Sequence, residues 1–398
     1  MDNYAHAKKI LALLFVLLLV FVWFKSAPYT TQQNIFDFIV SAVFHSEPEA
    51  VPALNMQEIE LEYVDSLQMK NDLIDINGAL AKIMNVQGYY SDMGMYITDE
   101  RYIVSMSEQT STDYEYDEIM AFKNYLDGQG IRLLYVNAPT KYTDDMLFSE
   151  EFGIESYSNR NADLLLQRIA DGGVNTIDLR REMEEEGMII TNMFYRTDHH
   201  WTTRTGLWAA RKIAEGLNQY CGYAIDTSIY DEENYSFKVW NDCWLGEQGR
   251  KLALSYVGLD DYEEIKPDFQ TNFLFKYGEE YIPGTFDEFV NEALYDTEIN
   301  VYDAGSWHYS YFWRNAVNQD VEYGKILFLG DSYAHVVEPF LALGVREINV
   351  LALRDFYGNL QEYIAAGGYD TIVICYAQFM IGAHDDPTSA NYSMFAFE

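Results

Sequence analysis

The stretch KILFLGDSYAHV, residues 325–336, decides the fold of this chain. Its first half is a run of apolar residues that stops at Gly330, a pattern typical of a strand buried on both faces. A helical pattern follows over residues 335–343, so Ser332 lies where a strand gives way to a helix. In open α/β sheets, ligands bind at the carboxyl ends of the strands. The segment therefore predicts either a reactive serine at the sheet edge or, more simply, a turn that caps the next helix.

Strand-like and helix-like segments alternate along the rest of the chain. The expected strands are short and largely apolar, at 131–136, 174–177, 325–329, 348–353 and 371–376. The expected helices lie between them, at 113–126, 162–170, 203–217, 335–343 and 356–366. Such alternation is typical of a parallel sheet covered by helices on both faces. We therefore predict an α/β fold with a parallel central sheet.

The N-terminus has the pattern of an export signal. Lys8 and Lys9 precede residues 10–24, which include no polar residue, and Lys25 follows. A cleaved signal peptide and an uncleaved signal anchor both fit, and the poor cleavage site at Ser26 favours the anchor. The lysine pair places the short N-terminus inside and the bulk of the chain outside. We predict a single-pass protein of the cell membrane with an extracytoplasmic domain or, alternatively, a secreted protein.

The expected domain organisation has three parts. Residues 1–27 form an N-terminal membrane-anchor helix, 28–53 a linker, and 54–398 a catalytic domain. The segment at about 220–310 is less regular and rich in Asp, Glu, Tyr and Gly. We interpret it as an irregular insertion that shapes a substrate groove.

Composition excludes several classes of function. The net charge of −37 argues against nucleic acid as a partner, because phosphate backbones require clustered Lys and Arg. Aromatic residues make up 16% of the chain, which modestly favours a polysaccharide partner, since flat rings stack on sugars. Three cysteines are too few for a disulfide-built scaffold, although one bridge between Cys221 and Cys243 is conceivable.

A second reactive segment is Thr197-Asp198-His199-His200-Trp201. In an extended segment, residues two apart point to the same side, so Asp198 and His200 face together while His199 points away. A carboxylate beside an imidazole fixes its tautomer and stabilises the imidazolium. We therefore expect His200 to act as a base that is oriented by Asp198, and Ser332 to act as its nucleophile.

A metal site is the alternative interpretation of the same segment, because Asp and His are also ligands of zinc and iron. No His-Glu-x-x-His motif is present, and the remaining histidines are scattered. His384, beside Asp385 and Asp386, is a rival base, although a solvated loop explains that polar run more simply. The serine mechanism is favoured, with no metal and no cofactor.

Three segments together resemble the DHHW protein family, which is similar to the alginate O-acetyltransferases of the AlgJ and AlgX type. They are Leu134–Lys141, which ends in Ala-Pro-Thr-Lys, Tyr195–Thr202, which contains Asp-His-His-Trp, and Phe328–Ala334, which contains Gly-Asp-Ser-Tyr. Their order along the chain is that of the family. The resemblance implies an SGNH hydrolase-like three-layer sandwich, in which the Asp/His pair precedes the serine.

The resemblance also implies roles for residues of this sequence. It makes Ser332, His200 and Asp198 a catalytic triad, and it suggests Gly246, Gln248 and Asn315 as candidates for oxyanion or substrate contacts. The implied activity is O-acetyl transfer to an exported or cell-surface polysaccharide, with a membrane O-acyltransferase as the partner that supplies the acetyl donor. A carbohydrate acetylesterase and a non-catalytic glycan-binding scaffold with a vestigial triad remain the alternatives.

Overall fold

The computed structural model describes residues 70–84, 88–90, 94–98, 101–143, 155–290, 301–302, 315–382, 385–389 and 391–398. The chain divides into two compact units, Met1–Met84 and Asn85–Glu398, whereas the sequence placed the start of the globular domain at residue 54. The expected anchor (1–27) and linker (28–53) lie outside the described residues. Within the described ranges, no helix is both long and apolar enough to cross a membrane. The described part of the first unit is helix α4, Lys70–Ile83.

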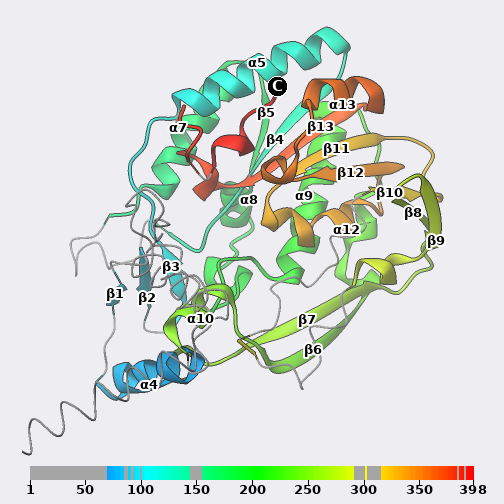
Figure 1. Ribbon diagram of the computed structural model, residues 1–398. Helices are drawn as coiled ribbons and strands as arrows, with labels where there is room; N and C mark the ends of the chain where they lie inside the picture. The colour runs from blue at the N-terminus through cyan, green and yellow to red at the C-terminus, as the bar shows by residue number, and fades with distance from the viewer. Residues whose placement is uncertain are drawn as a thin grey trace, which may run out of the picture. The chain divides into compact units, whose positions relative to one another are not determined.

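The second unit is built on an eight-stranded sheet (Figure 1). In spatial order its strands are β5 (Asn175–Asp178), β4 (Arg132–Ala138), β13 (Thr371–Ala377), β11 (Lys325–Gly330), β12 (Glu347–Leu351), β10 (Asn315–Asn318), β8 (Phe273–Tyr277) and β9 (Glu280–Gly284). The strands from β5 to β12 are mutually parallel. The expected strands therefore form the parallel part of the sheet, with β11 at the centre of the eight-stranded order.

The expectation of a wholly parallel sheet is wrong, because the sheet is mixed. β10 pairs antiparallel with β12 and β8, and β8 pairs antiparallel with β9. The hairpin β8–β9 turns at Gly278, whose φ of +60° suits glycine. This hairpin comes from the segment 220–310, which was expected to be an irregular insertion. In the described part of that segment, the hairpin β8–β9 extends the central sheet, while two further strands form a separate ribbon.

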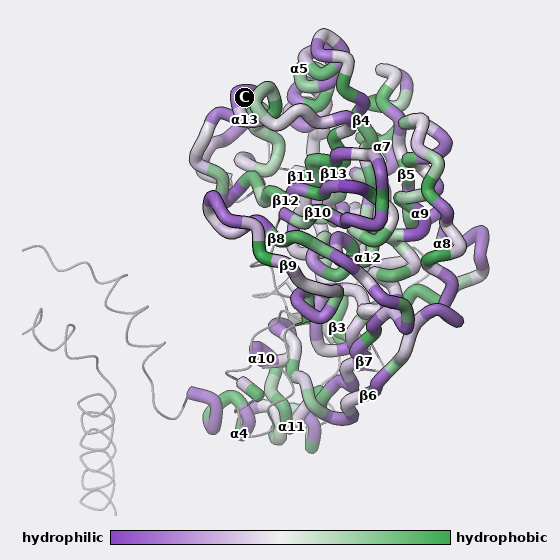
Figure 2. Tube along the Cα trace, turned by 90° about the vertical axis from the view of Figure 1, so that its right-hand side faces the viewer, coloured by the Kyte–Doolittle hydropathy of each residue, from purple (hydrophilic) through white to green (hydrophobic). Residues whose placement is uncertain are grey.

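Helices cover both faces of the sheet. One face carries α5 (Asp113–Gln129), α7 (Ser158–Asp171) and α13 (Leu360–Gly367), and the other carries α8 (Leu179–Glu185), α9 (Thr203–Cys221) and α12 (Glu338–Leu341). Alternate residues of β4 show how the core divides. Leu133 and Tyr135 pack with α5 and α7, while Leu134 and Val136 pack with α9. The outer helices mix hydrophobic and hydrophilic residues, as elements with one buried face do (Figure 2).

Smaller elements complete the second unit. They are β1 (Gly88–Tyr90), β2 (Met95–Ile97) and β3 (Ile103–Ser105) in a three-stranded sheet, β6 (Tyr235–Trp244) and β7 (Asp260–Pro267) in a ribbon, and the short helices α10 (Glu247–Leu252) and α11 (Leu254–Val257). The single-turn 3₁₀ helices are η3 (Ile190–Met193), η4 (Thr227–Tyr230), η5 (Glu232–Asn234), η6 (Phe286–Phe289), η8 (Ser332–Val336), η9 (Leu353–Asp355), η10 (Gln378–Met380) and η11 (Tyr392–Met394).

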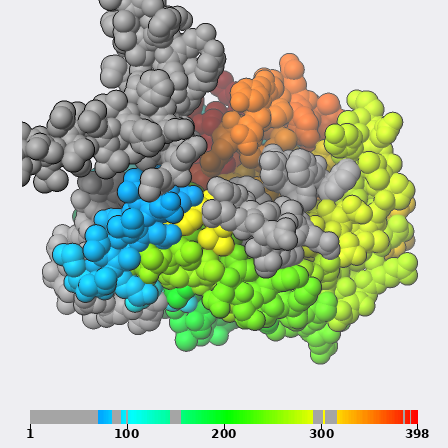
Figure 3. All heavy atoms as spheres, turned by 60° about the horizontal axis from the view of Figure 1, so that its bottom comes forward, coloured from blue at the N-terminus to red at the C-terminus, as the bar shows by residue number. Residues whose placement is uncertain are grey.

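The segment that follows α9 makes up much of one face of the molecule. Figure 3 shows its atoms in green to yellow-green, over the ribbon β6–β7 and the hairpin β8–β9. Cys221 ends α9, and Cys243 lies in β6. Both are free thiols, so the disulfide that the sequence made conceivable is not formed. Burial raises the pKa of the Cys221 thiol to about 11, which makes it unreactive.

Candidate functional site

A tight loop presents the two histidines. Phe194 and Trp201 form an isolated antiparallel bridge, and the backbone N–H of Tyr195 donates to the carbonyl oxygen of His200 over 3.1 Å. The loop closes at Thr202, whose hydroxyl caps α9 by accepting from the N–H of Thr205. The chain bends over residues 196–200, between the bridge partners.

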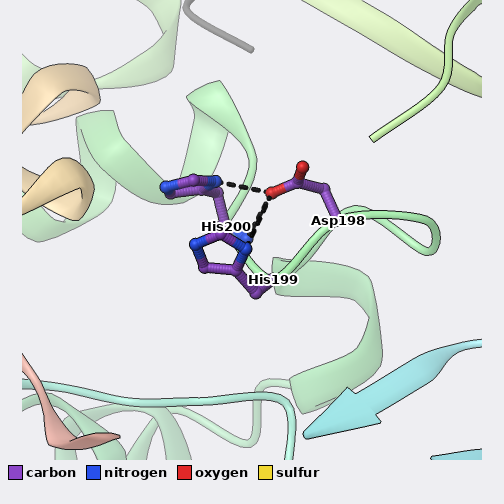
Figure 4. Close-up of side chains that lie close together, drawn as sticks. All are labelled: Asp198, His199 and His200. Carbon is purple, nitrogen blue, oxygen red and sulfur yellow. Dashed lines mark hydrogen bonds and ion pairs between the residues drawn. The ribbon is translucent and has the colours of Figure 1, made fainter. Parts of the chain in front are cut away.

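Asp198 and His200 form the predicted pair. Nδ1 of His200 lies 2.5 Å from Oδ1 of Asp198, and the backbone N–H of His200 donates to the same oxygen over 2.9 Å. The second oxygen, Oδ2, accepts the N–H of Glu247 over 2.7 Å. Burial alone would raise the pKa of Asp198, but the neighbouring charge and hydrogen bonds of His200 hold it well below its usual range. The carboxylate is therefore ionised and aligns the imidazole, leaving Nε2 on the side away from Asp198 (Figure 4).

The expectation that His199 points away from the carboxylate is wrong. Its Nδ1 lies 3.5 Å from Oδ1 of Asp198, and its ring centroid lies 3.8 Å from that of His200 (Figure 4). The alternation rule fails because residues 196–200 form a bend and not an extended strand. Burial lowers the pKa of His199, and the adjacent His200 lowers it further. His199 is thus a neutral imidazole beside the pair.

The same three side chains have the composition of a metal site. The ligand atoms of Asp198, His199 and His200 all lie within 4.8 Å of one another. Imidazole nitrogen and carboxylate oxygen are ligands that zinc accepts. A cation bound by His200 would take either Nδ1, which forms the short hydrogen bond with Asp198, or Nε2, the nitrogen that would receive the proton. The arrangement therefore supports either a proton relay or a metal site, but not both at once.

Ser332 stands at the end of the central strand. β11 ends at Gly330, where a Cβ would collide with the side chain of Ala334, so the turn requires glycine. The Asp331 carboxylate accepts the N–H of Tyr333 over 2.8 Å and the N–H of Ala377 over 2.7 Å, which ties the turn to the end of β13. Ser332 is the first residue of η8 and is half-buried. Its position at a strand-to-helix junction is the one expected from the sequence.

Tyr333 joins the serine turn to the histidine loop. Its hydroxyl donates to the carbonyl oxygen of His199 over 2.5 Å, and its own carbonyl oxygen accepts the Nε1–H of Trp201 over 3.0 Å. Its ring centroid lies 5.3 Å from that of His200. The two predicted segments, 132 or more residues apart in sequence, therefore meet in space. Among the described hydrogen bonds there is none between Ser332 and His200, so the triad stays a prediction.

The other suggested site residues occupy three different environments. The N–H of Gly246 donates to Oγ1 of Thr197 over 2.8 Å, so it holds the histidine loop. Gln248 donates to Oγ of Ser105 over 2.7 Å and lines a cavity. Asn315 begins β10, opposite Asn349 of β12, and does not line that cavity. Of these three residues, Gln248 is the one that lines the cavity, and the roles of all three stay predictions.

A cavity of about 270 Å³ lies beside the histidines. Its lining includes Ser105, Thr140, Lys141, His199, Gln248, Tyr333 and Phe379. The sequence marked Lys141 only as the end of a resembling motif, and it gave no signal for Ser105 or Phe379. The one pattern that points to Lys141 is a lysine just beyond the carboxyl end of a buried strand.

Comparisons with known proteins agree with the fold. Residues 91–234 match the family model of the SGNH hydrolase-like domain of the acetyltransferase AlgX. The match includes Asp198 and His200 and ends before Ser332. No curated protein matches the chain significantly.

Solved structures provide the wider comparison. Bacillus cereus PatB1 has a TM-score of 0.55 and 18% identity, over 76% of this chain and 98% of that chain. A PatB1 structure with a sulfonyl adduct has a TM-score of 0.55 and 17% identity, over 76% of this chain and 97% of that chain. A DHHW family protein from Eubacterium siraeum has a TM-score of 0.54 and 15% identity, over 78% of this chain and 97% of that chain. These likenesses, all at low identity, show a shared fold, and residues 91–234 are the part of the chain that is similar to the SGNH hydrolase-like domain of the acetyltransferase AlgX.

Proposed function

We propose that this protein transfers acetyl groups to the hydroxyls of an exported or cell-surface polysaccharide, with Ser332 as the nucleophile. The observation that carries the proposal is the short hydrogen bond between Asp198 and His200, set beside the turn that bears Ser332. An ionised, buried carboxylate on Nδ1 makes the opposite nitrogen of an imidazole a good general base. The match to an acetyltransferase domain supports acyl transfer as the reaction.

The first half-reaction forms an acetyl-enzyme. As Oγ of Ser332 attacks the acetyl carbonyl carbon, its proton passes to Nε2 of His200. The bond from that carbon to the donor's leaving oxygen then breaks, and the proton moves from Nε2 to the leaving oxygen. Asp198 holds the imidazole throughout and stabilises its transient positive charge. The reaction requires Oγ of Ser332 to lie within hydrogen-bond reach of Nε2 of His200 in the reacting complex.

The second half-reaction releases the acetyl group to the acceptor. A sugar hydroxyl gives its proton to Nε2 of His200 and attacks the ester carbonyl. The Ser332 oxygen leaves and takes the proton back. Water in place of the sugar would make the protein an acetylesterase, so exclusion of water from the cavity decides between the two activities.

The cellular setting belongs to the same proposal. The cationic and apolar N-terminal sequence supports export of the catalytic domain with membrane anchoring. Acetyl groups activated in the cytoplasm must then cross the membrane, so a membrane O-acyltransferase is the proposed partner. A high aromatic content supports a sugar polymer as the acceptor.

The test uses the full-length protein and a sulfonyl fluoride probe, a reagent that leaves a sulfonyl group on reactive nucleophiles. We expect the wild type to be labelled at Ser332 and to release p-nitrophenol from p-nitrophenyl acetate. Ser332→Ala should lose labelling, and its turnover should fall on the order of 10⁴-fold. Ser236→Ala, on the exposed side of β6, is the matched control and should behave as wild type.

Mass spectrometry of added oligosaccharides then separates the possible activities. An acetylated oligosaccharide supports transfer, whereas free acetate alone indicates an acetylesterase. An unlabelled protein that binds glycan without turnover would be a glycan-binding scaffold with a vestigial triad. Equal turnover by wild type and Ser332→Ala would refute the serine mechanism.

A further inference from the structure

Lys141 is a buried cation next to the histidine loop. It follows the end of β4 by three residues, and its side chain is 3% exposed. Lysine is almost never buried to this extent unless it is paired. Burial lowers the pKa of Lys141 to about 7, while the carboxylates of Asp198 and Asp260 oppose that shift. Desolvation of the Lys141 ammonium is unfavourable, so we expect this side chain to form interactions that an apolar side chain cannot form.

All hydrogen-bond partners of the Lys141 amine in the structure are oxygen acceptors. Nζ donates to the carbonyl oxygen of Asp198 over 2.6 Å and to that of Tyr195 over 3.1 Å. It also lies 3.3 Å from the carbonyl oxygen of Arg196 and 3.1 Å from Oε1 of Gln248. An ammonium has three N–H donors and no lone pair, so the protonated form matches these surroundings.

Three of those four oxygens belong to the backbone of the loop that carries the catalytic pair. A loop bend with several carbonyl groups turned inward is stable only if donors meet them. Nζ of Lys141 supplies the donors for all three backbone carbonyl groups. One of these carbonyl groups is that of Asp198. The lysine therefore fixes the backbone of the residue whose carboxylate holds His200.

The fourth contact links the lysine to α10. Gln248 accepts from Lys141 and donates to Ser105, while its neighbour Glu247 donates its N–H to Oδ2 of Asp198. The backbone and the carboxylate of Asp198 are thus held from two directions by groups that Lys141 connects. The four acceptors outnumber the three N–H donors of the ammonium, so all of its donors are engaged within the protein.

We propose that Lys141 is a positioning residue for acyl transfer, which sets the distance between Asp198 and His200 by holding the carbonyl groups of their loop. The inference rests on the proposed function for its kinetic consequence. The charged and titratable groups that face Lys141 are Asp198, Asp260 and His199. A displacement of about 1 Å in a catalytic pair is enough to slow a reaction roughly 100-fold.

The test compares Lys141→Met with Lys276→Met in the full chain. Methionine keeps the length of the side chain and removes its donors, and Lys276 is exposed on β8. For Lys141→Met we expect kcat on p-nitrophenyl acetate to fall about 10- to 100-fold, with little change in KM. Lys276→Met should keep both constants. Lys141→Arg, which restores charge and donors, should recover part of the lost kcat.

Proton NMR gives a readout that needs no turnover. The short hydrogen bond between His200 and Asp198 should produce a far-downfield imidazole proton signal in the wild type. That signal should be lost or shifted in Lys141→Met and retained in Ser332→Ala and Lys276→Met. If the wild type has no esterase turnover, the proposed function fails while this comparison still tests Lys141.

A folded Lys141→Met protein with wild-type kcat and an unchanged downfield signal would overturn the inference. If the methionine variant does not fold, Lys141→Gln replaces it, since glutamine retains two N–H donors without the charge. Wild-type kcat and an unchanged signal in folded Lys141→Gln would equally overturn it. Lower kcat with a shifted signal supports it.

Discussion

The two oxygens of the Asp198 carboxylate have separate partners: Oδ1 lies 2.5 Å from Nδ1 of His200, and Oδ2 accepts the N–H of Glu247 over 2.7 Å. Rotation of the carboxylate would break both contacts. The imidazole is therefore held in one orientation and one tautomer, with its proton on Nδ1. This arrangement stabilises an imidazolium without requiring any movement of the carboxylate during proton transfer.

Replacement of Asp198 by asparagine should abolish most turnover. An asparagine amide can turn its nitrogen toward Nδ1 of His200 and so favour the wrong imidazole tautomer, which leaves the proton on Nε2. We expect kcat for p-nitrophenyl acetate to fall on the order of 10⁴-fold, with a much smaller change in KM. Asp268→Asn, which changes an exposed carboxylate, is the control. Turnover of Asp198→Asn near that of Asp268→Asn would show that the pair has no part in the reaction.

Asp198 should also make stability depend on pH. Its pKa in the folded protein is lower than the ordinary value of 3.8, so the unfolded chain binds more protons at acid pH. The stabilisation from its ionised form is fully present above pH of about 4 and is lost as the pH falls further. We expect urea unfolding to show a steeper loss of stability below pH of about 4 in the wild type than in Asp198→Asn. Parallel curves for the two proteins at acid pH would contradict this assignment.

The sequence was sufficient to predict the contact between Asp198 and His200 but not the residues that surround them. A carboxylate and an imidazole two positions apart in the sequence predicted the contact between Asp198 and His200. The side on which His199 lies depended on the bend of the loop. That bend is set by Lys141 and by Asp260, whose carboxylate accepts the N–H groups of Arg196 and Thr197. Both partners are remote in sequence, so no local pattern could reveal them.

In the central sheet too, the local sequence predicted some strands, whereas the pairing of others depends on contacts between distant segments. Apolar runs with helices between them predicted β4, β11, β12 and β13, whose residues are largely buried, and β5 was predicted from a short strand-like segment after a helix. The antiparallel extension was missed, since β8 and β10 are short strands in which buried residues alternate with less buried ones. Pairing of β10 with β12 and β8 is a tertiary contact, and the direction of a strand in a sheet is not encoded in its own composition.

Gly246 should be intolerant of any side chain. It caps α10 with an ordinary φ of −67°, so backbone strain is not the reason. A Cβ at this position would collide with the side chain of Asp198 and with the backbone of Thr197. We expect Gly246→Ala to lower stability by about 1–3 kcal/mol and to reduce kcat, because α10 must move off the carboxylate.

Gly128→Ala is the matched control for that variant. Gly128 lies within α5, and a Cβ there meets no atom within 4 Å. Alanine should stabilise this helix by about 0.5–1 kcal/mol and leave kcat unchanged. The two changes in stability are measured by urea unfolding. Equal effects at the two positions would show that α10 can shift freely against the histidine loop.

Removal of metal ions should leave the reaction unaffected. The serine mechanism needs both ring nitrogens of His200, Nδ1 for the hydrogen bond with Asp198 and Nε2 for the proton of the serine, and a cation bound by Asp198, His199 and His200 would occupy one of them. We therefore expect turnover of p-nitrophenyl acetate to be unchanged after treatment with EDTA and desalting. Added Zn²⁺ should inhibit, because it withdraws the general base, and His199→Asn should weaken that inhibition by removing one ligand.

The opposite pattern would favour a metal-dependent hydrolase. In that case EDTA would abolish turnover, stoichiometric Zn²⁺ would restore it, and Ser332→Ala would retain activity. His199→Asn would then lose activity together with its metal. The two mechanisms thus predict opposite signs for the effect of zinc, since a single set of atoms cannot bind the cation and relay the proton at the same time.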